Sequence, residues 1–224
     1  MKRVGAPTNT LVYTKCNDDY LLFSGPQRLN LAAVSTADGK LLWKHFTGGK
    51  VNFPPFVWKN RVYVGSNEGR VYAFEAATGR LLWRFQAAPA IRRSPVYGRL
   101  PSTRPVSGGL VLHEGTLFAA AGIAHYDGTH VYASDPLTGK IKWHNGDSGA
   151  LNPVIRNGVS LHGQLSIGTT PQHGQVLQFA GGNAVATAMY NLKTGKCLTP
   201  PPTAPQGIAR STFYIQEFLN RRQQ

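Results

Sequence analysis

Short runs of β-branched, aromatic and aliphatic residues recur along the chain, and turn-forming residues separate them. One such run is Val71-Tyr72-Ala73-Phe74, which is followed by Thr78-Gly79 and then by Leu81-Leu82-Trp83. Valine and aromatic residues favour strands, and glycine adopts the positive φ of a tight turn at little cost. The pattern therefore predicts an antiparallel hairpin over residues 71–83.

The phrase that contains this hairpin occurs four times. The clearest copies are Val71–Trp83 and Val131–Trp143, an earlier copy is Leu31–Trp43, and a worn copy is Ala188–Leu198. The turn glycines that anchor the copies lie 40, 60 and 56 residues apart, and they are Gly39, Gly79, Gly139 and Gly195. A recurrence of this size indicates one supersecondary unit that is repeated.

A second hairpin precedes two of these copies. Phe56-Val57-Trp58 and Arg61–Val64 flank Lys59-Asn60, and Leu110–Leu112 and Thr116–Ala119 flank His113-Glu114-Gly115. Each unit then has four short antiparallel strands, which is typical of β-propeller blades. We expect an all-β fold, a partial propeller of about four blades over 1–203. The expected blades cover about 8–47, 48–87, 88–149 and 150–200, and a tail covers 204–224.

The repeated phrase, with its alanine, acidic residue, Thr-Gly and tryptophan, resembles the tryptophan-docking motif of PQQ-like (quinoprotein-like) propeller repeats. The resemblance covers about residues 20–200, and the stretches Gly48–Pro55, Pro105–Val111 and Ala180–Ala184 are similar to an uncharacterised bacterial subgroup. It implies that each docking tryptophan packs against the alanine of its own motif and the glycine turn of a neighbouring blade. The residues with this expected structural role are Trp43, Trp83, Trp143, Gly39, Gly79, Gly139, Gly195, Ala33, Ala73 and Ala133.

The fourth copy differs from the others at the docking position. Thr199 stands where the tryptophan would fall. Because terminal repeats are atypical, we expect this blade to end the array.

The family name raises the possibility of a quinone-dependent dehydrogenase. The resemblance implies that such members hold PQQ and calcium, with a vicinal disulfide, carboxylate and amide ligands and a catalytic aspartate. The cysteines of this chain, Cys16 and Cys197, are far apart, and it has only ten acidic residues. Calcium prefers several oxygen ligands with carboxylates among them. We therefore predict no cofactor, no catalytic set and no metal site.

Two histidines deserve a separate interpretation as zinc ligands. His125 and His130 enclose Asp127-Gly128, and imidazoles with a carboxylate can bind zinc. No third strong ligand is fixed nearby in the sequence, and Asp-Gly is also a turn signal. We favour the turn.

Positive charge is concentrated in one segment. The chain carries 24 Lys and Arg against 10 Asp and Glu, a net charge of +14, and no acidic residue lies between Glu75 and Glu114. The middle of that span, 87–109, is predicted to be a long connection between strands, and four arginines there are candidates for binding an anion or a protein partner. They are Arg92, Arg93, Arg99 and Arg104. The alternative is a solvated loop, or ion pairs with other blades. No nucleic-acid motif accompanies them, so nucleic acid is not expected.

These observations favour a non-catalytic propeller module that acts as a scaffold or binding domain for a protein or an anionic polymer. Part of a PQQ-dependent oxidoreductase is the alternative. No apolar run is long enough to span a membrane, and the basic N-terminus lacks the apolar core of a signal peptide, although the resemblance implies the periplasm or the cell exterior. Uncovered terminal blades would leave apolar faces, so we expect self-association or further blades in a longer chain.

Overall fold

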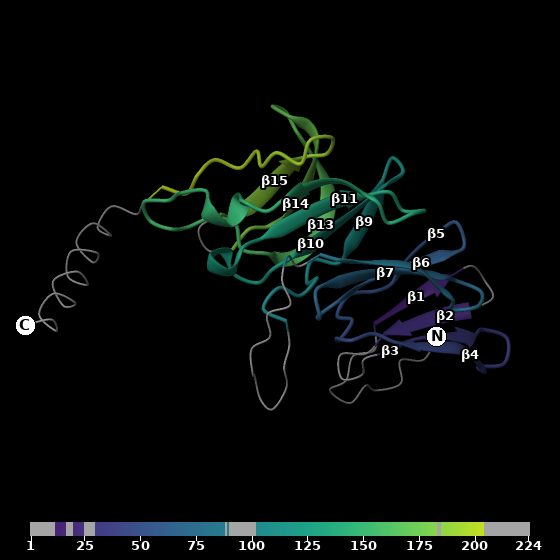
Figure 1. The fold of residues 1–224 in the computed structure, drawn as a ribbon. Helices are drawn as coiled ribbons and strands as arrows, with labels where there is room; N and C mark the ends of the chain where they lie inside the picture. The colour runs from purple at the N-terminus through teal and green to yellow at the C-terminus, as the bar shows by residue number, and fades with distance from the viewer. Residues whose placement is uncertain are drawn as a thin grey trace, which may run out of the picture.

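The computed structural model describes residues 12–16, 20–24, 30–87, 89, 102–182 and 185–203, with side chains from residue 31 onward. Its strands form four antiparallel sheets that follow one another in chain order (Figure 1). Sheet 1 contains β1 (Val12–Cys16), β2 (Tyr20–Ser24), β3 (Asn30–Ser35) and β4 (Leu41–Phe46). Sheet 2 contains β5 (Phe56–Trp58), β6 (Arg61–Ser66), β7 (Arg70–Glu75) and β8 (Leu81–Gln86).

The second half of the molecule repeats this pattern. Sheet 3 contains β9 (Leu110–His113), β10 (Thr116–Ala121), β11 (His130–Ser134) and β12 (Ile141–Asn145). Sheet 4 contains β13 (His162–Thr170), β14 (Gly174–Ala180) and β15 (Thr187–Asn191). Two single 3-10 turns lie between strands, η1 (His125–Asp127) and η2 (Ser148–Ala150). The all-β prediction is confirmed. The tail 204–224 lies outside the described residues.

Sheet 4 has three strands instead of the four that the repeat predicts. A single bridge, Tyr190 to Cys197, stands where the fourth strand would begin. Pro200 and Pro201 follow closely, and proline has no N–H to donate to a ladder. The hydroxyl of Thr199 accepts the Met189 N–H at 2.8 Å, so a side chain replaces a ladder bond there.

The antiparallel order gives every sheet two distinct ends. One end, which we call the linker end, contains the connections between successive sheets. It also contains the turn between the second and third strands of each sheet. The Thr-Gly turns of the repeated phrase lie at the opposite end, the turn end. These turns share one geometry, in which the Gly79 N–H donates to the Glu75 carbonyl and the Glu75 N–H donates to the Arg80 carbonyl. Gly79 has φ +71°, which explains why glycine occupies this position.

Three apolar cores hold the sheets together, one at each junction. The core between sheets 1 and 2 includes Leu31, Val62 and Phe74; Tyr63, Val71 and Tyr132 belong to the core between sheets 2 and 3. The third core fills the space between sheets 3 and 4. Because sheets 2 and 3 are covered on both faces, consecutive residues of β7 and β11 are buried rather than alternate ones.

One contact recurs at every junction. Each docking tryptophan is paired in register with the alanine of its own phrase, and its ring lies over the turn glycine of the next sheet. The indole N–H donates to the carbonyl three residues before that glycine, at 2.8–3.1 Å. The tryptophan, glycine and acceptor sets are Trp43, Gly79 and Ala76; Trp83, Gly139 and Pro136; and Trp143, Gly195 and Leu192.

We predict that Trp83→Ala lowers the free energy of unfolding by about 3–5 kcal/mol, the range for truncating a packed aromatic side chain. The loss includes the ring contact with Gly139 and the hydrogen bond to Pro136. Urea unfolding followed by circular dichroism measures it. An unchanged midpoint would show that the indole contributes little to the junction.

A matched pair of glycines separates the docking contact from backbone strain. Gly139 and Gly115 both have positive φ, +72° and +67°, so alanine is strained at either position by about 1–2 kcal/mol. A Cβ at Gly139 would lie 2.7 Å from the Trp83 ring, whereas a Cβ at Gly115 would meet nothing within 4 Å. We expect Gly139→Ala to destabilise the protein clearly more than Gly115→Ala. Equal losses of stability in the two variants would show that backbone strain alone causes both.

Candidate functional site

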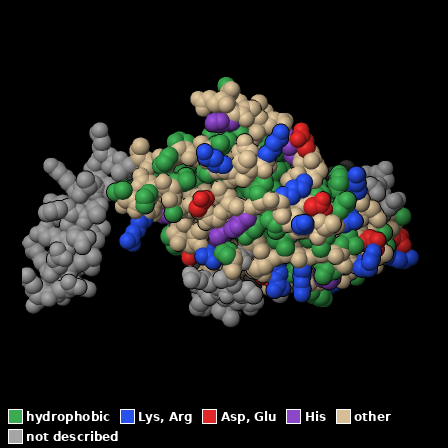
Figure 2. Space-filling model, turned by 45° about the horizontal axis from the view of Figure 1, so that its top comes forward, with side chains coloured by type: hydrophobic (Ala, Val, Ile, Leu, Met, Phe, Trp, Pro, Cys, Tyr) green, Lys and Arg blue, Asp and Glu red, His purple; other side chains and the backbone are tan. Residues whose placement is uncertain are grey.

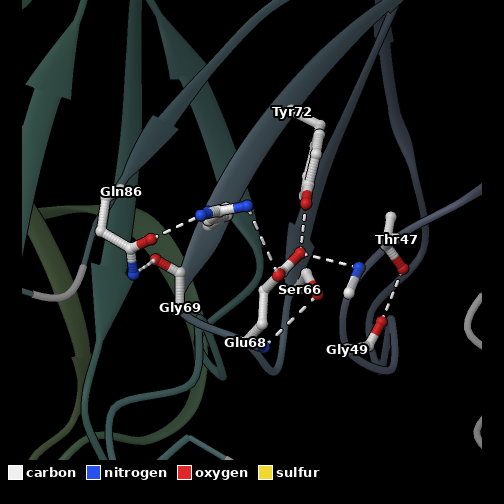
Figure 3. Close-up of polar contacts among 9 residues, drawn as sticks. Thr47, Gly49, Ser66, Glu68, Gly69, Tyr72 and Gln86 are labelled. Atoms are coloured by element: carbon white, nitrogen blue, oxygen red, sulfur yellow. Dashed lines mark hydrogen bonds and ion pairs between the residues drawn. The ribbon is translucent and has the colours of Figure 1, made fainter. Parts of the chain in front are cut away.

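Partly buried polar side chains form several contacts at the linker end. The strongest cluster lies between sheets 1 and 2, around Glu68 (Figure 3). The side chain of Glu68 is 9% exposed; it accepts the Gly48 N–H at 2.8 Å and the hydroxyl proton of Tyr72. Burial and this bond to the carboxylate raise the pKa of Tyr72. The cluster therefore fastens the connection that follows β4 to the β6–β7 turn.

Arg70 extends the Glu68 cluster toward β8. Its guanidinium lies 3.7 Å from the second Glu68 oxygen and donates to the Gln86 amide oxygen at 2.9 Å. The amide nitrogen of Gln86 in turn donates to the Gly69 carbonyl at 3.0 Å. The Arg70 guanidinium thus contacts both the Glu68 carboxylate and the Gln86 amide.

Two histidines meet at the linker end of sheet 3. Nδ1 of His130 lies 3.2 Å from Nε2 of His144, and the His144 ring stacks on Tyr132 with centroids 4.3 Å apart. His130 is 7% exposed, and its Nε2 has no hydrogen-bond partner among the described residues. Burial, with smaller contributions from the charges of His144 and Arg104, lowers the pKa of His130 to about 4. His130 is therefore neutral at physiological pH.

The loops beside this histidine pair pack on one another. The His125 N–H donates to the Ser160 hydroxyl at 3.0 Å, and the Thr129 hydroxyl donates to the Val159 carbonyl at 2.6 Å. These bonds join the β10–β11 loop, which contains η1, to the β12–β13 loop, which contains η2. His125 and His130 thus take different partners. Within the described ranges, no three His, Cys, Asp or Glu side chains gather as a metal-binding group.

Large apolar side chains project from the same pair of loops. Ile123 is 49% exposed, Tyr126 is 79% exposed and Val154 is 89% exposed. Val154 stands at the tip of a small hairpin that Asn152 and Asn157 close with two backbone hydrogen bonds. The Asn152 side chain also accepts the Val154 N–H at 3.0 Å, so the tip is held in place. We call Ile123, Tyr126 and Val154 the loop surface.

The turn end has a cavity of about 270 Å³ between sheets 3 and 4, and Phe118, Trp143 and Leu192 are among its lining residues. Differences between the repeats account for it. At the junction of sheets 2 and 3, Arg61 donates to the Leu137 carbonyl and Tyr63 donates to the Pro136 carbonyl. The equivalent positions of sheet 3 hold Thr116, whose hydroxyl accepts from Lys142 Nζ at 2.7 Å, and Phe118, which has no polar group. Lys142 and Lys193 line the space.

Only part of the predicted arginine site can be placed. Arg92, Arg93 and Arg99 lie outside the described residues. Arg104 is half-buried, and its Nε donates to the Asp127 carbonyl at 2.6 Å, so it fastens two loops together. Figure 2 shows Lys and Arg side chains scattered over the visible face, with fewer acidic ones. The side chain of Cys16 is not described, and Cys197 is a free thiol whose pKa is raised by burial.

The sequence did not predict a role for Glu68, Tyr72, His144 or the loop surface. One of these, Tyr72, had a signal in the sequence, because Tyr72 and Tyr132 occupy the same position of the repeated phrase, seven residues before the turn glycine. The partners of these tyrosines, Glu68 and His144, differ between sheets. A repeat comparison therefore finds the tyrosines but not what they bind.

The comparisons with known proteins agree with this architecture. The model of the PQQ_2 family, described as outer membrane protein assembly factor BamB, matches residues 8–215. The chain belongs to this family of PQQ-like propeller repeats. A europium-containing methanol dehydrogenase superposes with a TM-score of 0.62 over 86% of this chain and 41% of its own, at 16% identity. This likeness confirms the predicted β-propeller fold.

Relatives in the PQQ-like family carry different activities. A quinohemoprotein alcohol dehydrogenase of Pseudomonas putida is 34% identical over 122 residues, which are 50% of this chain and 16% of that enzyme. A tetrathionate hydrolase of Acidithiobacillus ferrooxidans is 24% identical over 81% of this chain and 43% of its own length. The chain thus spans less than half of the length of either relative. Family membership gives the fold, and activity must be argued from the site.

A further finding concerns membranes. Among the described residues, no helix has the length and apolar character needed to cross a bilayer.

We predict that stability falls as the pH falls from about 6.5 to 4. The folded pKa of His130, about 4, lies below the ordinary value of 6.5, so the unfolded chain binds a proton that the folded chain excludes. The contribution is complete above pH 6.5 and is lost as the pH falls toward 4, and the loss is on the order of 3 kcal/mol. Urea midpoints at pH 7.5 and pH 5 measure the slope.

The control for this pH dependence is another histidine. His130→Asn should flatten the slope of stability with pH, whereas the same substitution at the exposed His173 should leave it unchanged. A slope that persists in the His130 variant would assign the effect to other groups.

Proposed function

We propose that the chain is a non-catalytic PQQ-like module that binds a protein partner through the loop surface. The observation that carries this proposal is the exposure of Ile123, Tyr126 and Val154 on two loops that pack on each other. Large apolar side chains that are exposed on loops of fixed conformation are typical of protein–protein interfaces, in which tyrosine is enriched.

The framework beneath the loop surface supports binding with little ordering cost. Asn152 accepts the N–H groups of Val154 and Ile155, and its own amide donates to the Pro202 carbonyl at 2.9 Å. Loops that are already fixed lose less conformational entropy when a partner binds. Arg156 is exposed on the same hairpin, and arginine is also enriched at interfaces.

The description of the matched family supports the same proposal. Its model is named for an outer membrane protein assembly factor, a name that denotes action on other proteins. A protein partner accords with that name.

A displayed peptide library selected against the whole protein tests the loop surface. We expect the selected peptides to bind the wild type and to lose at least about tenfold in affinity, or 1.4 kcal/mol, with Ile123→Ser, Tyr126→Ser and Val154→Ser combined. Leu137→Ser is the matched control, since Leu137 is 46% exposed at the turn end. Peptides that bind both variants alike would refute the proposal.

Part of a PQQ-dependent oxidoreductase is the second candidate, because the dehydrogenase of Pseudomonas putida is among the relatives. The polar side chains described at the linker end are poor ligands for calcium and PQQ. Glu68 already accepts from Gly48 and Tyr72 and faces the cation Arg70, whereas calcium requires several available oxygen ligands.

Titration of the protein with PQQ and calcium separates the two candidates. We expect no saturable change in the quinone absorption and no dye reduction with added alcohols. Stoichiometric quinone binding that depends on calcium would favour the oxidoreductase.

The arginine segment supports a third candidate, binding of an anionic polymer. If Arg92, Arg93, Arg99 and Arg104 form such a site, changing all four to serine lowers the salt concentration at which heparin releases the protein. A matched variant removes four exposed lysines elsewhere, Lys44, Lys59, Lys140 and Lys196, and should elute later than the arginine variant. Identical elution of the two variants would show that the positive charge acts diffusely.

A further inference from the structure

The cavity at the turn end, between sheets 3 and 4, occupies a place that side chains fill at the junction between sheets 2 and 3. At that earlier junction, Arg61 and Tyr63 of β6 donate to two carbonyls of the next Thr-Gly turn, at 2.7 and 3.0 Å. The strand registers align Thr116 of β10 with Arg61, and Phe118 with Tyr63. Because threonine is much shorter than arginine and phenylalanine lacks the phenol hydroxyl, the corresponding space stays open.

The inner wall of this cavity is aromatic. The ring centroids of Phe118 and Trp143 lie 5.9 Å apart at an interplanar angle of 47°. Tyr63 and Trp83 have almost the same arrangement at the preceding junction, 5.8 Å and 43°, so sheet 3 keeps the ring and loses only its hydroxyl. Phe118 is 1% exposed and Leu192 is half-buried, so a group that contacts them is itself shielded from water. The wall therefore favours a flat apolar group.

The opening of the cavity carries positive charge. Lys142 and Lys193 are lining residues with exposed side chains. Nζ of Lys142 donates to the Thr116 hydroxyl at 2.7 Å and to the Gly115 carbonyl at 3.3 Å, and both acceptors are neutral. Within the described part of the chain, neither lysine forms an ion pair, and the acidic lining residue Glu114 has a side chain that is 77% exposed. Two ammonium groups beside an apolar wall attract an anion.

We propose that this cavity binds a small aromatic carboxylate, whose ring contacts Phe118 and Trp143 and whose carboxylate lies between Lys142 and Lys193. The volume of about 270 Å³ lies just below the usual range of about 300–1,000 Å³ for ligand pockets, so the ligand is small. A cationic ligand would be repelled by both ammonium groups. The cavity lies at the opposite end of the sheets from the loop surface, so this inference does not depend on the proposed function.

Calorimetric titration of the full chain with three compounds of similar shape tests the ligand class. Cinnamate is the carboxylate probe, cinnamyl alcohol is the neutral control and cinnamylamine is the cationic control. We expect saturable binding of one cinnamate per chain and binding of the alcohol and the amine that is severalfold weaker. An amine that binds as tightly as cinnamate would overturn the choice of an anion, and a lack of saturable cinnamate binding would overturn the site.

Removal of the positive charges tests the opening. Lys142→Gln and Lys193→Gln should each weaken cinnamate binding severalfold and leave the weak binding of cinnamyl alcohol unchanged. Lys44→Gln is the matched control, because Lys44 is an exposed lysine on the outer strand β4 of sheet 1, and its affinity for cinnamate should equal that of the wild type. An equal loss in the control variant would show that the net charge of the chain attracts the anion, and would overturn the proposal.

The residue pair of sheet 2 provides a variant that fills the cavity. Thr116→Arg combined with Phe118→Tyr copies the pair that occupies the preceding junction, and the new donors would face the carbonyls of Leu192 and Lys193. We expect this variant to keep the circular dichroism spectrum and the urea midpoint of the wild type and to lose cinnamate binding. A folded variant that still binds cinnamate would overturn the placement of the ligand. If the variant does not fold, the lysine variants still decide the question, because they change only exposed side chains.

Discussion

The contact between an indole ring and a glycine turn is the constraint on which the rest of the structure depends. It works only because the turn glycine has no side chain, which lets the ring of the preceding sheet lie directly on the backbone. The same ring donates its N–H to a carbonyl in that turn, so one residue joins apolar packing to a directed hydrogen bond. The spacing between sheets is thereby set at the turn end, and the apolar cores fill the space behind it.

At the linker end, polar contacts join the sheets, and they differ from junction to junction. Glu68 with Tyr72 and Arg70 joins sheets 1 and 2, while Thr129 and His125 join the loops between sheets 3 and 4. The docking contacts at the turn end are thus repeated at every junction, whereas the polar contacts at the linker end are individual. A repeat protein can change its linker-end loops without disturbing the docking contacts, which is why binding surfaces gather on such loops.

The first and last sheets of the described array differ from each other. Sheet 4 has Thr199 where a docking tryptophan would stand, whereas sheet 1 exposes Leu41 and Phe46. A propeller removes sheet edges and covers apolar faces by radial repetition.

The sequence by itself determined the repeat, the hairpins and the docking residues, because these depend on local strand propensity and on glycine at turns with positive φ. It also indicated, through Thr199, that the fourth copy is atypical. Only the tertiary structure decided that His130 pairs with His144 rather than with His125, and that Arg104 fastens a loop. It also decided that Glu68 is nearly buried and that Tyr126 is exposed. Such contacts join residues from different strands and loops, and no periodicity along the chain encodes them.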